Sequence, residues 1–192
     1  MKIGFIVLAG GKSKRMAYPK HELKFHNQRM IDFIVNKVKV MTDYIYISAN
    51  QTINGYKITH DQRQDIGPIE GIYQCMNYSR CDYYCVITCD NPLIPISVYQ
   101  SMLENIGEKE CIVLKNNGKV EPLVSVFKRD TLNKIKKQIE EENYSVNDLC
   151  QSLDTAYYNS DLIFINVDTK EDYQKLISEH EKNWLINESM VF

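Results

Sequence analysis

The strongest constraint on this chain is a short apolar run near its start that ends in glycines. Residues 3–8 read Ile-Gly-Phe-Ile-Val-Leu without polar alternation, and Ala9, Gly10 and Gly11 follow directly. A continuous apolar run of this length, closed by glycine, is typical of a strand buried on both faces, as in a parallel sheet. The chain is therefore expected to build a central sheet that is covered on both sides.

The remainder of the chain alternates between strand-like and helix-like patterns. Strands are expected at 44–48, 83–89 and 162–166, and on both sides of an Asn-Gly hairpin turn at 116–119. Helices are expected at 30–41, 71–78, 96–106, 129–142 and from Thr169. Thr169 and Asp172 have the spacing of a capping box. This alternation predicts an α/β fold, a three-layer Rossmann-like sandwich with a mostly parallel central sheet.

Chain length, net charge and the length of the apolar runs narrow the class of protein further. A length of 192 residues favours one domain, taken as 1–192, with residues 181–192 as a tail of uncertain order. The net charge of −2 gives no basic balance that would point to a nucleic-acid partner. The apolar runs are shorter than the roughly 18–20 residues that span a bilayer. We expect a cytoplasmic protein with no membrane partner, in which the six cysteines are buried, reduced thiols.

A cationic segment follows the glycine turn and raises the question of which anion it binds. The letters GKS at 11–13 match the end of the P-loop pattern G-x-x-x-x-G-K-[ST], but its first glycine would fall on Ile6, inside the strand. The P-loop interpretation therefore fails. What remains is a turn of small residues whose backbone N–H groups can approach an anion, with Arg15 and Lys20 available for separate phosphates. The alternative is a solvated basic patch.

Two acidic residues stand after strand-like segments, Asp90 after the strand at 83–89 and Asp61 after a further short strand. Asp90 ends the strand at 83–89, and a carboxylate there suits Mg2+, which takes one or two protein carboxylates together with phosphate oxygens and waters. Asp61 opens a loop in which Gly67-Pro68 and Gly71 form a rigid turn that could contact a base. A carboxylate acceptor with backbone groups can recognise guanine. The alternatives are a turn residue before Asn-Pro for Asp90 and a plain surface loop for Asp61.

Five motifs, in this order, resemble the nucleotidyltransferase superfamily and most closely the molybdenum cofactor guanylyltransferases. The family opening LAGG-x-S-x-R-M-G-x-D-K stands here as LAGGKSKRMAYPK, and the family's D…GPL-x-G as DQRQDIGPIEGI. The family's CD-x-P stands as CDNP, its proline-leucine segment as VEPLVSVF, and its N-V-N-T-P-E-D as NVDTKED. The resemblance covers residues 3 to about 177.

The resemblance implies a Mg2+-dependent enzyme that transfers GMP from GTP to the terminal phosphate of molybdopterin and releases pyrophosphate. It implies catalytic roles for Arg15, Lys20 and Asp90, with Asp90 as the metal ligand, and places Asn166 near the pterin-side substrate. GTP and molybdopterin are the implied partners, and transient contacts with molybdoenzymes or their chaperones are a further expectation. The residues with implied nucleotide contacts are Leu8, Ala9, Gly10, Gly11, Lys20, Ser48, Asn50, Asp61, Gly67, Pro68, Gly71 and Asp90.

The chain also departs from the family pattern. Ala17 replaces a glycine and Pro19 replaces the aspartate before Lys20, while Asp168 and Lys170 replace an asparagine and a proline. An added negative charge near an anionic substrate is unfavourable, so Asp168 is expected to face away from the site. Three alternatives stay open: a cytidylyltransferase acting on molybdopterin, a sugar-phosphate nucleotidyltransferase, and a non-catalytic nucleotide-binding adaptor.

Overall fold

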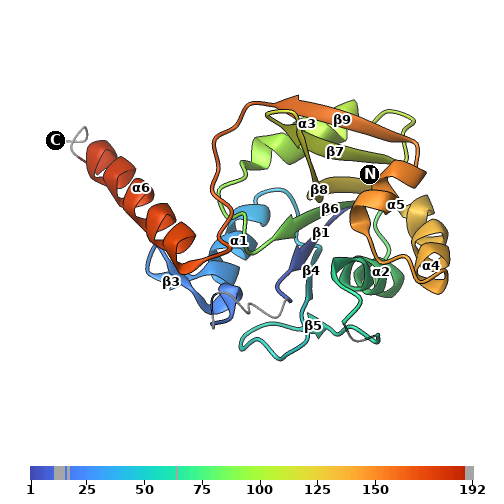
Figure 1. Cartoon of the computed structure of the whole chain (residues 1–192), viewed down its shortest axis with the longest axis horizontal. Coiled ribbons are helices and arrows are strands. Elements are labelled where there is room, and N and C mark those ends of the chain that lie inside the picture. Colours follow the sequence, from blue (N-terminus) through green and yellow to red (C-terminus); the bar gives the residue numbers. More distant parts are fainter. Residues whose placement is uncertain (11–15, 17, 64, 189–192) are drawn as a thin grey trace.

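One seven-stranded sheet forms the centre of the molecule. A computed structural model describes residues 1–10, 16, 18–63 and 65–188, with side chains through residue 179. The strands of the sheet, in spatial order, are β5 (Ile58–Thr59), β4 (Ile45–Ser48), β1 (Ile3–Leu8), β6 (Tyr83–Thr88), β8 (Lys119–Lys128), β7 (Cys111–Asn116) and β9 (Thr155–Ser160) (Figure 1). A separate two-stranded hairpin consists of β2 (Lys24–Phe25) and β3 (Gln28–Arg29).

The sheet is mostly parallel, as predicted. β1 pairs in parallel with both β4 and β6, β4 pairs in parallel with β5, and β7 pairs in parallel with β9. Within the described seven-stranded sheet, β8 runs antiparallel to its neighbours β6 and β7. The carboxyl ends of β1, β4 and β6 therefore meet at the same edge of the sheet.

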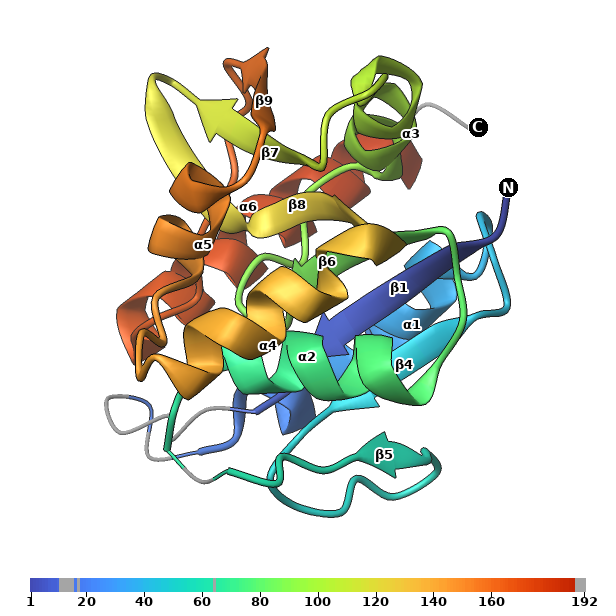
Figure 2. The same cartoon turned by 90° about the vertical axis from the view of Figure 1, so that its right-hand side faces the viewer.

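Helices cover both faces of the sheet, which confirms the predicted three-layer α/β arrangement. Successive side chains of a strand point to opposite faces, and β1 accordingly contributes Phe5 and Val7 to one core and Ile6 and Leu8 to the other. The first core includes side chains of α1, α3 and α6, and the second those of α2, α4 and α5, which lie across the sheet in Figure 2. The helices are α1 (Met30–Val38), α2 (Pro68–Tyr78), α3 (Ile96–Asn105), α4 (Leu132–Glu140), α5 (Val146–Ser152) and α6 (Lys170–Glu188).

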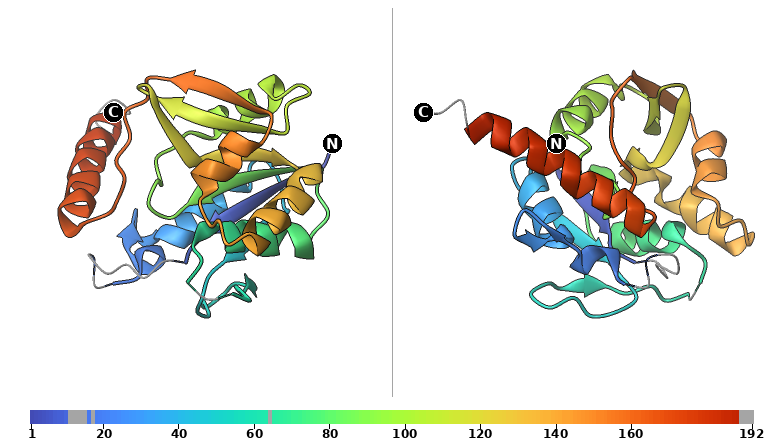
Figure 3. Two further views of the ribbon diagram at one scale, coloured as in Figure 1. Left: turned by 45° about the vertical axis from the view of Figure 1, so that its right-hand side comes forward. Right: turned by 60° about the vertical axis from the view of Figure 1, so that its left-hand side comes forward.

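Helix α6 lies on the outside of the first layer, and its carboxyl end extends away from the body of the molecule (Figures 1 and 3). The predicted capping box at its start is confirmed, because Thr169 Oγ1 accepts from the Asp172 N–H at 3.1 Å and the Asp172 carboxylate accepts from the Thr169 N–H at 2.8 Å. None of the helices in the described ranges has both the length and the apolar character that crossing a membrane requires.

The prediction of a strand at 162–166 is wrong, because these residues form no strand in the structure. The last strand is β9, which pairs along the whole of β7, and the following residues 161–169 form an irregular strap that leads to α6. The Asn116 side chain binds the Leu162 backbone: it accepts from the Leu162 N–H at 2.8 Å and donates to the Leu162 carbonyl at 2.9 Å. Leu162 and Phe164 pack on the core while Ile163 is 95% exposed. Buried and exposed side chains therefore alternate along this irregular segment, as they do along a strand, and this explains the strand-like sequence pattern.

Two short helical segments complete the chain. η1 (Lys20–Glu22) follows the glycine turn, and η2 (Arg129–Thr131) precedes α4. Helix α5 was missing from the sequence-based expectation, and Ser145 caps it by accepting from the Asp148 N–H at 3.1 Å. The six cysteines are free and buried, as expected.

Candidate active site

A pocket of about 690 Å3 opens at the carboxyl ends of β1, β4 and β6. In open parallel sheets this edge is where ligands bind. The structure brings together here nearly all of the residues that the sequence singled out. The predicted residues that line the pocket are Leu8, Ala9, Gly10, Lys20, Ser48, Asn50, Asp61, Gly67, Pro68, Gly71 and Asp90.

Three predicted residues stand apart from this set. Gly11 and Arg15 lie outside the described residues, so their roles stay predictions. Asn166 is not among the residues that line the pocket. It precedes Val167, whose N–H donates to the Asp90 carbonyl at 2.8 Å, and its buried side-chain oxygen has no partner among the described residues. Its predicted contact with the pterin-side substrate likewise stays a prediction.

The sequence reasoning also missed residues that line the pocket. They are Asp65, Thr88, Cys89 and Leu123, and Asp168, which was expected to face away, lines the pocket as well. Thr88 and Cys89 could have been found, because they end the same strand that delivers Asp90. Leu123 lies in the proline-leucine motif at 120–127, to which no role had been assigned.

The backbone at the end of β1 is tied to both neighbouring strands. The Ala9 N–H donates to the Ser48 carbonyl at 2.9 Å, and the Cys89 N–H donates to the Leu8 carbonyl at 3.3 Å. Continued pairing on both sides holds the start of the glycine turn in line with the sheet. Gly10, which has no side chain, leaves this part of the pocket wall to the backbone.

Helix α2 reaches the same edge because of its glycines. Gly67 has φ +83°, a left-handed conformation that favours glycine, and Pro68 then begins the helix. A side chain at Gly71 would collide with the Ser48 hydroxyl group and crowd Leu8. The absence of a side chain therefore lets the first turn of α2 pack against the ends of β1 and β4, where it forms one wall of the pocket.

Asp61 faces the pocket from the loop after β5. Its Oδ1 accepts from the Ser48 hydroxyl group at 3.2 Å. Burial raises the pKa of the Asp61 carboxyl and the negative charge of Glu70 adds to this, whereas the Ser48 hydrogen bond acts in the opposite direction. A half-buried carboxylate of this kind is a hydrogen-bond acceptor in need of donors, which a ligand can supply.

A buried carboxylate on helix α2 binds the backbone of the loop that carries Asp61. Glu70, on the first turn of α2, is fully buried and accepts from the backbone N–H groups of Gln62 and Arg63, each at 3.1 Å. The Arg63 guanidinium and the Gln74 amide donate to the same carboxylate at 3.1 and 2.8 Å. Because a buried charge needs partners on all sides, these contacts fix the loop against the helix.

Among the described residues, one ammonium and two carboxylates lie close together in the pocket. Lys20 Nζ lies 2.8 Å from Asp168 Oδ1 and 3.6 Å from Asp90 Oδ2, and the Thr88 hydroxyl group donates to Asp90 Oδ1. The expectation that Asp168 faces away is wrong. Its backbone N–H donates to Asp172 at the start of α6, and its carboxylate binds Lys20, whose positive charge offsets the added negative charge.

The donor set at Asp90 fits a magnesium ion that a phosphate ligand helps to hold. Its side chain is 31% exposed and lines the pocket. The described residues contain no group of three or more His, Cys, Asp or Glu side chains that could form a metal site by themselves. Mg2+ usually takes one or two protein carboxylates and draws its other ligands from phosphates and water, so the Asp90 carboxylate matches its preference.

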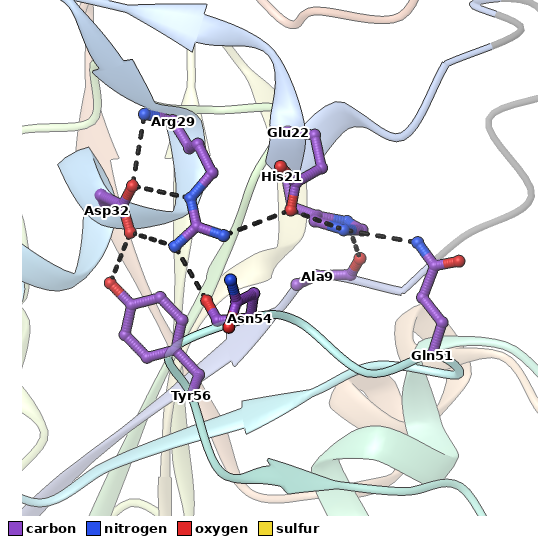
Figure 4. Close-up of polar contacts among 8 residues, drawn as sticks. All are labelled: Ala9, His21, Glu22, Arg29, Asp32, Gln51, Asn54 and Tyr56. Atoms are coloured by element: carbon purple, nitrogen blue, oxygen red, sulfur yellow. Dashed lines mark hydrogen bonds and ion pairs between the residues drawn. The ribbon is translucent and has the colours of Figure 1, made fainter.

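His21, which the sequence reasoning missed, joins the Lys20 segment to the glycine turn. Its Nδ1 lies 3.1 Å from the Ala9 carbonyl, which can only accept, so Nδ1 carries the proton (Figure 4). Gln51 Nε2 lies 3.4 Å from the other ring nitrogen. Burial lowers the pKa of His21, although the nearby Glu22 carboxylate raises it. No sequence pattern could have distinguished this histidine from a surface one.

A second polar group in Figure 4 supports the same segment. Arg29 donates to Asp32 through Nε and Nη2, both at 2.8 Å, and also to the Asn54 carbonyl at 3.0 Å. The Tyr56 hydroxyl group donates to Asp32 at 2.8 Å, and Arg29 reaches Glu22 at 3.4 Å. The guanidinium holds the pKa of the Asp32 carboxyl below its usual range. These contacts join η1 to the β2–β3 hairpin and the loop after β4.

A glycine turn, a lysine and an acidic strand end around one pocket of a Rossmann-like sheet are typical of enzymes that bind nucleotides. Residues 5–156 match the profile of the MobA-like NTP transferase domain. The chain belongs to this family and is a nucleotidyltransferase.

Individual relatives agree with this assignment. A protein of Halalkalibacterium halodurans, named a probable molybdenum cofactor guanylyltransferase, is 25% identical over 185 residues, which cover 87% of this chain and 93% of the relative. The crystal structure of molybdopterin-guanine dinucleotide biosynthesis protein A from Archaeoglobus fulgidus has a TM-score of 0.78 at 15% identity and covers 93% of this chain and 99% of that one.

A more distant structure shares the fold as well. CMP:2-keto-3-deoxy-manno-octonic acid synthetase, complexed with CTP, has a TM-score of 0.76 at 11% identity and covers 95% of this chain and 100% of that one. At such low identity the two structural likenesses show the fold alone. The fold therefore does not choose the base, and this choice depends on the residues of the pocket.

Proposed function

We propose that the protein transfers GMP from GTP to molybdopterin, forms the guanine dinucleotide form of the cofactor and releases pyrophosphate. The observation that carries this proposal is a pocket that Lys20, Asp90 and Asp61 line together, where Lys20 lies in η1, Asp90 follows β6 and Asp61 follows β5. Lys20 and Asp90 suit the phosphates and their metal, and Asp61 suits the base. The names of the relatives support the choice of the two substrates.

Guanine fits the acceptor that the pocket offers. A carboxylate has only acceptor sites when ionised, and guanine presents two adjacent donors, N1–H and N2–H2, on one edge. Cytosine presents one donor group beside two acceptors, so it would leave one carboxylate oxygen unpaired. The Ser48 hydroxyl group already donates to one oxygen of Asp61, which orients the carboxylate. This chemistry supports GTP over CTP.

The proposed reaction is an in-line displacement at the α-phosphate of GTP. An oxygen of the terminal phosphate of molybdopterin forms a bond to the α-phosphorus. The bond from the α-phosphorus to the bridging oxygen breaks, and the pyrophosphate leaves with that electron pair. The attacking phosphate is already ionised at neutral pH, so the reaction needs no general base. Positioning and charge neutralisation therefore carry most of the catalysis.

The chain's own residues divide this work. The backbone of Leu8, Ala9 and Gly10 approaches the phosphates, and Lys20 offsets the charge that develops on the leaving pyrophosphate. Arg15 is proposed for the same task. Asp90 holds Mg2+, which when bound supplies charge neutralisation at the phosphate oxygens. The places of Lys20 and Asp90 in the pocket and their charges support their roles, and the role of Arg15 rests on the sequence resemblance.

A nucleotide-specificity assay on the purified protein tests the proposal. Pyrophosphate release is measured with Mg2+, molybdopterin and each of GTP, CTP, ATP and UTP. We expect GTP to be the preferred substrate by at least about tenfold, the effect of about 1.4 kcal/mol from one well-placed hydrogen bond. Preference for CTP would replace the guanylyl assignment by a cytidylyl one. Nucleotide binding without turnover would support an adaptor instead.

A further inference from the structure

The cation that is proposed to bind the nucleotide phosphates is already engaged by the protein. Lys20 Nζ donates to Asp168 at 2.8 Å and lies 3.6 Å from Asp90, and its side chain is only 20% exposed. All three residues line the pocket. An ammonium that binds phosphates must first give up at least part of this contact.

The backbone that carries Asp168 is held in place on both sides. The Val167 N–H donates to the Asp90 carbonyl at 2.8 Å, and the Asp168 N–H donates to Asp172 at 3.1 Å. The Thr169 hydroxyl group and N–H both donate to the same Asp172 carboxylate at 2.8 Å. Asp168 is thus a built-in part of the pocket rim, and its carboxylate stays near the phosphate site when Lys20 moves.

Among the residues that the structure describes, the charges around Lys20 do not favour an anionic ligand. Two carboxylates share one ammonium, so the three side chains together carry a net negative charge. A nucleoside triphosphate that draws Lys20 toward itself adds further negative charge and takes the Lys20 ammonium away from both carboxylates. Like charges at these distances oppose binding, and they do so more strongly in a half-buried pocket than in water.

We propose that Asp168 competes with the nucleotide for Lys20 and so makes nucleotide binding depend on a divalent cation. This inference rests on the proposed function, because it takes a nucleoside triphosphate as the ligand of the pocket. A nucleotide without a metal binds weakly, since it must take Lys20 from Asp168. A nucleotide that arrives with a divalent cation brings the positive charge that the carboxylates lose. The coupling between metal and nucleotide is therefore a property of this side chain.

The test compares nucleotide affinity with and without metal in matched variants. Isothermal titration gives the Kd of GTP in EDTA and in saturating Mg2+ for the wild type, Asp168→Asn and Asp161→Asn. Asp161 is an exposed aspartate at the other end of the same strap and does not line the pocket. Its variant changes the net charge by the same amount as Asp168→Asn and leaves the pocket unaltered. Thermal unfolding of each variant shows whether it is folded.

We expect Asp168→Asn to bind GTP about tenfold tighter in EDTA, with a much smaller change in Mg2+, so that the metal–nucleotide coupling falls by about 1.4 kcal/mol. Asp161→Asn should behave like the wild type. In a Lys20→Met background the gain from Asp168→Asn should shrink, because the competition runs through Lys20. A readout of coupling separates this role from a structural one, which would change stability and leave the coupling intact.

Three results would overturn the inference. Unchanged affinity of Asp168→Asn in EDTA would show that Asp168 does not compete for Lys20. An equal gain in Asp161→Asn would assign the effect to net charge. A loss of affinity confined to Mg2+ would make Asp168 a group that favours the metal complex. Repeating the titrations with CTP, ATP and UTP separates the two proposals: tight binding of another nucleotide with the same coupling refutes GTP alone, and no binding of any nucleotide refutes both.

Discussion

The two loops that bring opposite charges into the pocket are anchored in different ways. Two groups hold the turn that carries Asp90. The Val167 N–H donates to the Asp90 carbonyl, and Lys37 Nζ of α1 donates to the carbonyls of Pro92 and Ile94 at 2.5 and 2.8 Å. The described contacts of the segment that carries Lys20 run through side chains: the His21 ring donates to the Ala9 carbonyl at the end of β1, Glu22 lies 3.4 Å from Arg29, and Lys20 forms ion pairs of its own.

These anchors indicate that the Asp90 turn stays in place and that the Lys20 side chain can change its partners. Charged hydrogen bonds to backbone carbonyls are stronger than neutral ones, and they act on the turn itself rather than on a side chain. The Asp90 turn is therefore the fixed reference of the pocket. Lys20 ends a long side chain whose partners are other side chains, so it can exchange them for a ligand, as the competition with Asp168 requires.

Removal of the carboxylate at the fixed turn should have the largest effect. Asp90→Ala is expected to lower turnover by roughly 10²–10³, by analogy with the loss of one preorganised group that stabilises transition-state charge. Pyrophosphate release as a function of Mg2+ measures it. Asp82→Ala is the matched control, because Asp82 precedes the same strand at the opposite edge of the sheet. Full Mg2+-dependent activity of Asp90→Ala would show that the metal assignment is wrong.

Weakening the anchor behind this turn should have an intermediate effect. Lys37→Met leaves the carbonyls of Pro92 and Ile94 without their donor, and we expect the Mg2+ concentration for half-maximal activity to rise by roughly tenfold, the effect of losing about one charged hydrogen bond. Lys39→Met, at an exposed lysine just after α1, is the control. A lower melting temperature with unchanged Mg2+ dependence would reduce Lys37 to a purely structural role.

The state of Lys37 also predicts a dependence on pH. Burial lowers its pKa to about 8, so the ammonium loses its charge as the pH rises through about 8. The charged hydrogen bonds to the Asp90 turn then become neutral and weaker. We expect the Mg2+ requirement of the wild type to rise from pH 7 to pH 9 more steeply than that of Lys37→Met, which has no group to titrate. Parallel curves for the two proteins would contradict this.

The anchor of the adjustable side should show the smallest effect, on stability. Burial lowers the pKa of His21 below the unfolded value of 6.5, so the unfolded chain binds more protons as the pH falls below 6.5. The free energy of unfolding should then fall by at most about 1.4 kcal/mol per pH unit relative to His21→Asn, whose amide can still donate to the Ala9 carbonyl. Denaturant unfolding between pH 7.5 and 5 measures it, and identical slopes would refute a buried, neutral His21.

Sequence patterns predicted the edge of the sheet well because each strand there ends at a residue that interrupts the pattern. Glycines follow β1, Asp90 and a proline follow β6, and Asp61 follows β5. A parallel arrangement then requires these ends to meet. The strap at 161–169 escaped prediction because a segment that packs alternate side chains on a core has the same period as a strand, and only pairing distinguishes the two.

Local patterns and strand ends in the sequence were therefore enough to predict the α/β class, the edge of the sheet where the site lies and most of the residues that line the pocket. The tertiary structure alone decided that Asp168 binds Lys20, that His21 supports the glycine turn and that Lys37 holds the Asp90 turn. Each of these contacts joins residues that are distant in the chain, and the partner of a charged or polar side chain is set by the packing of whole elements.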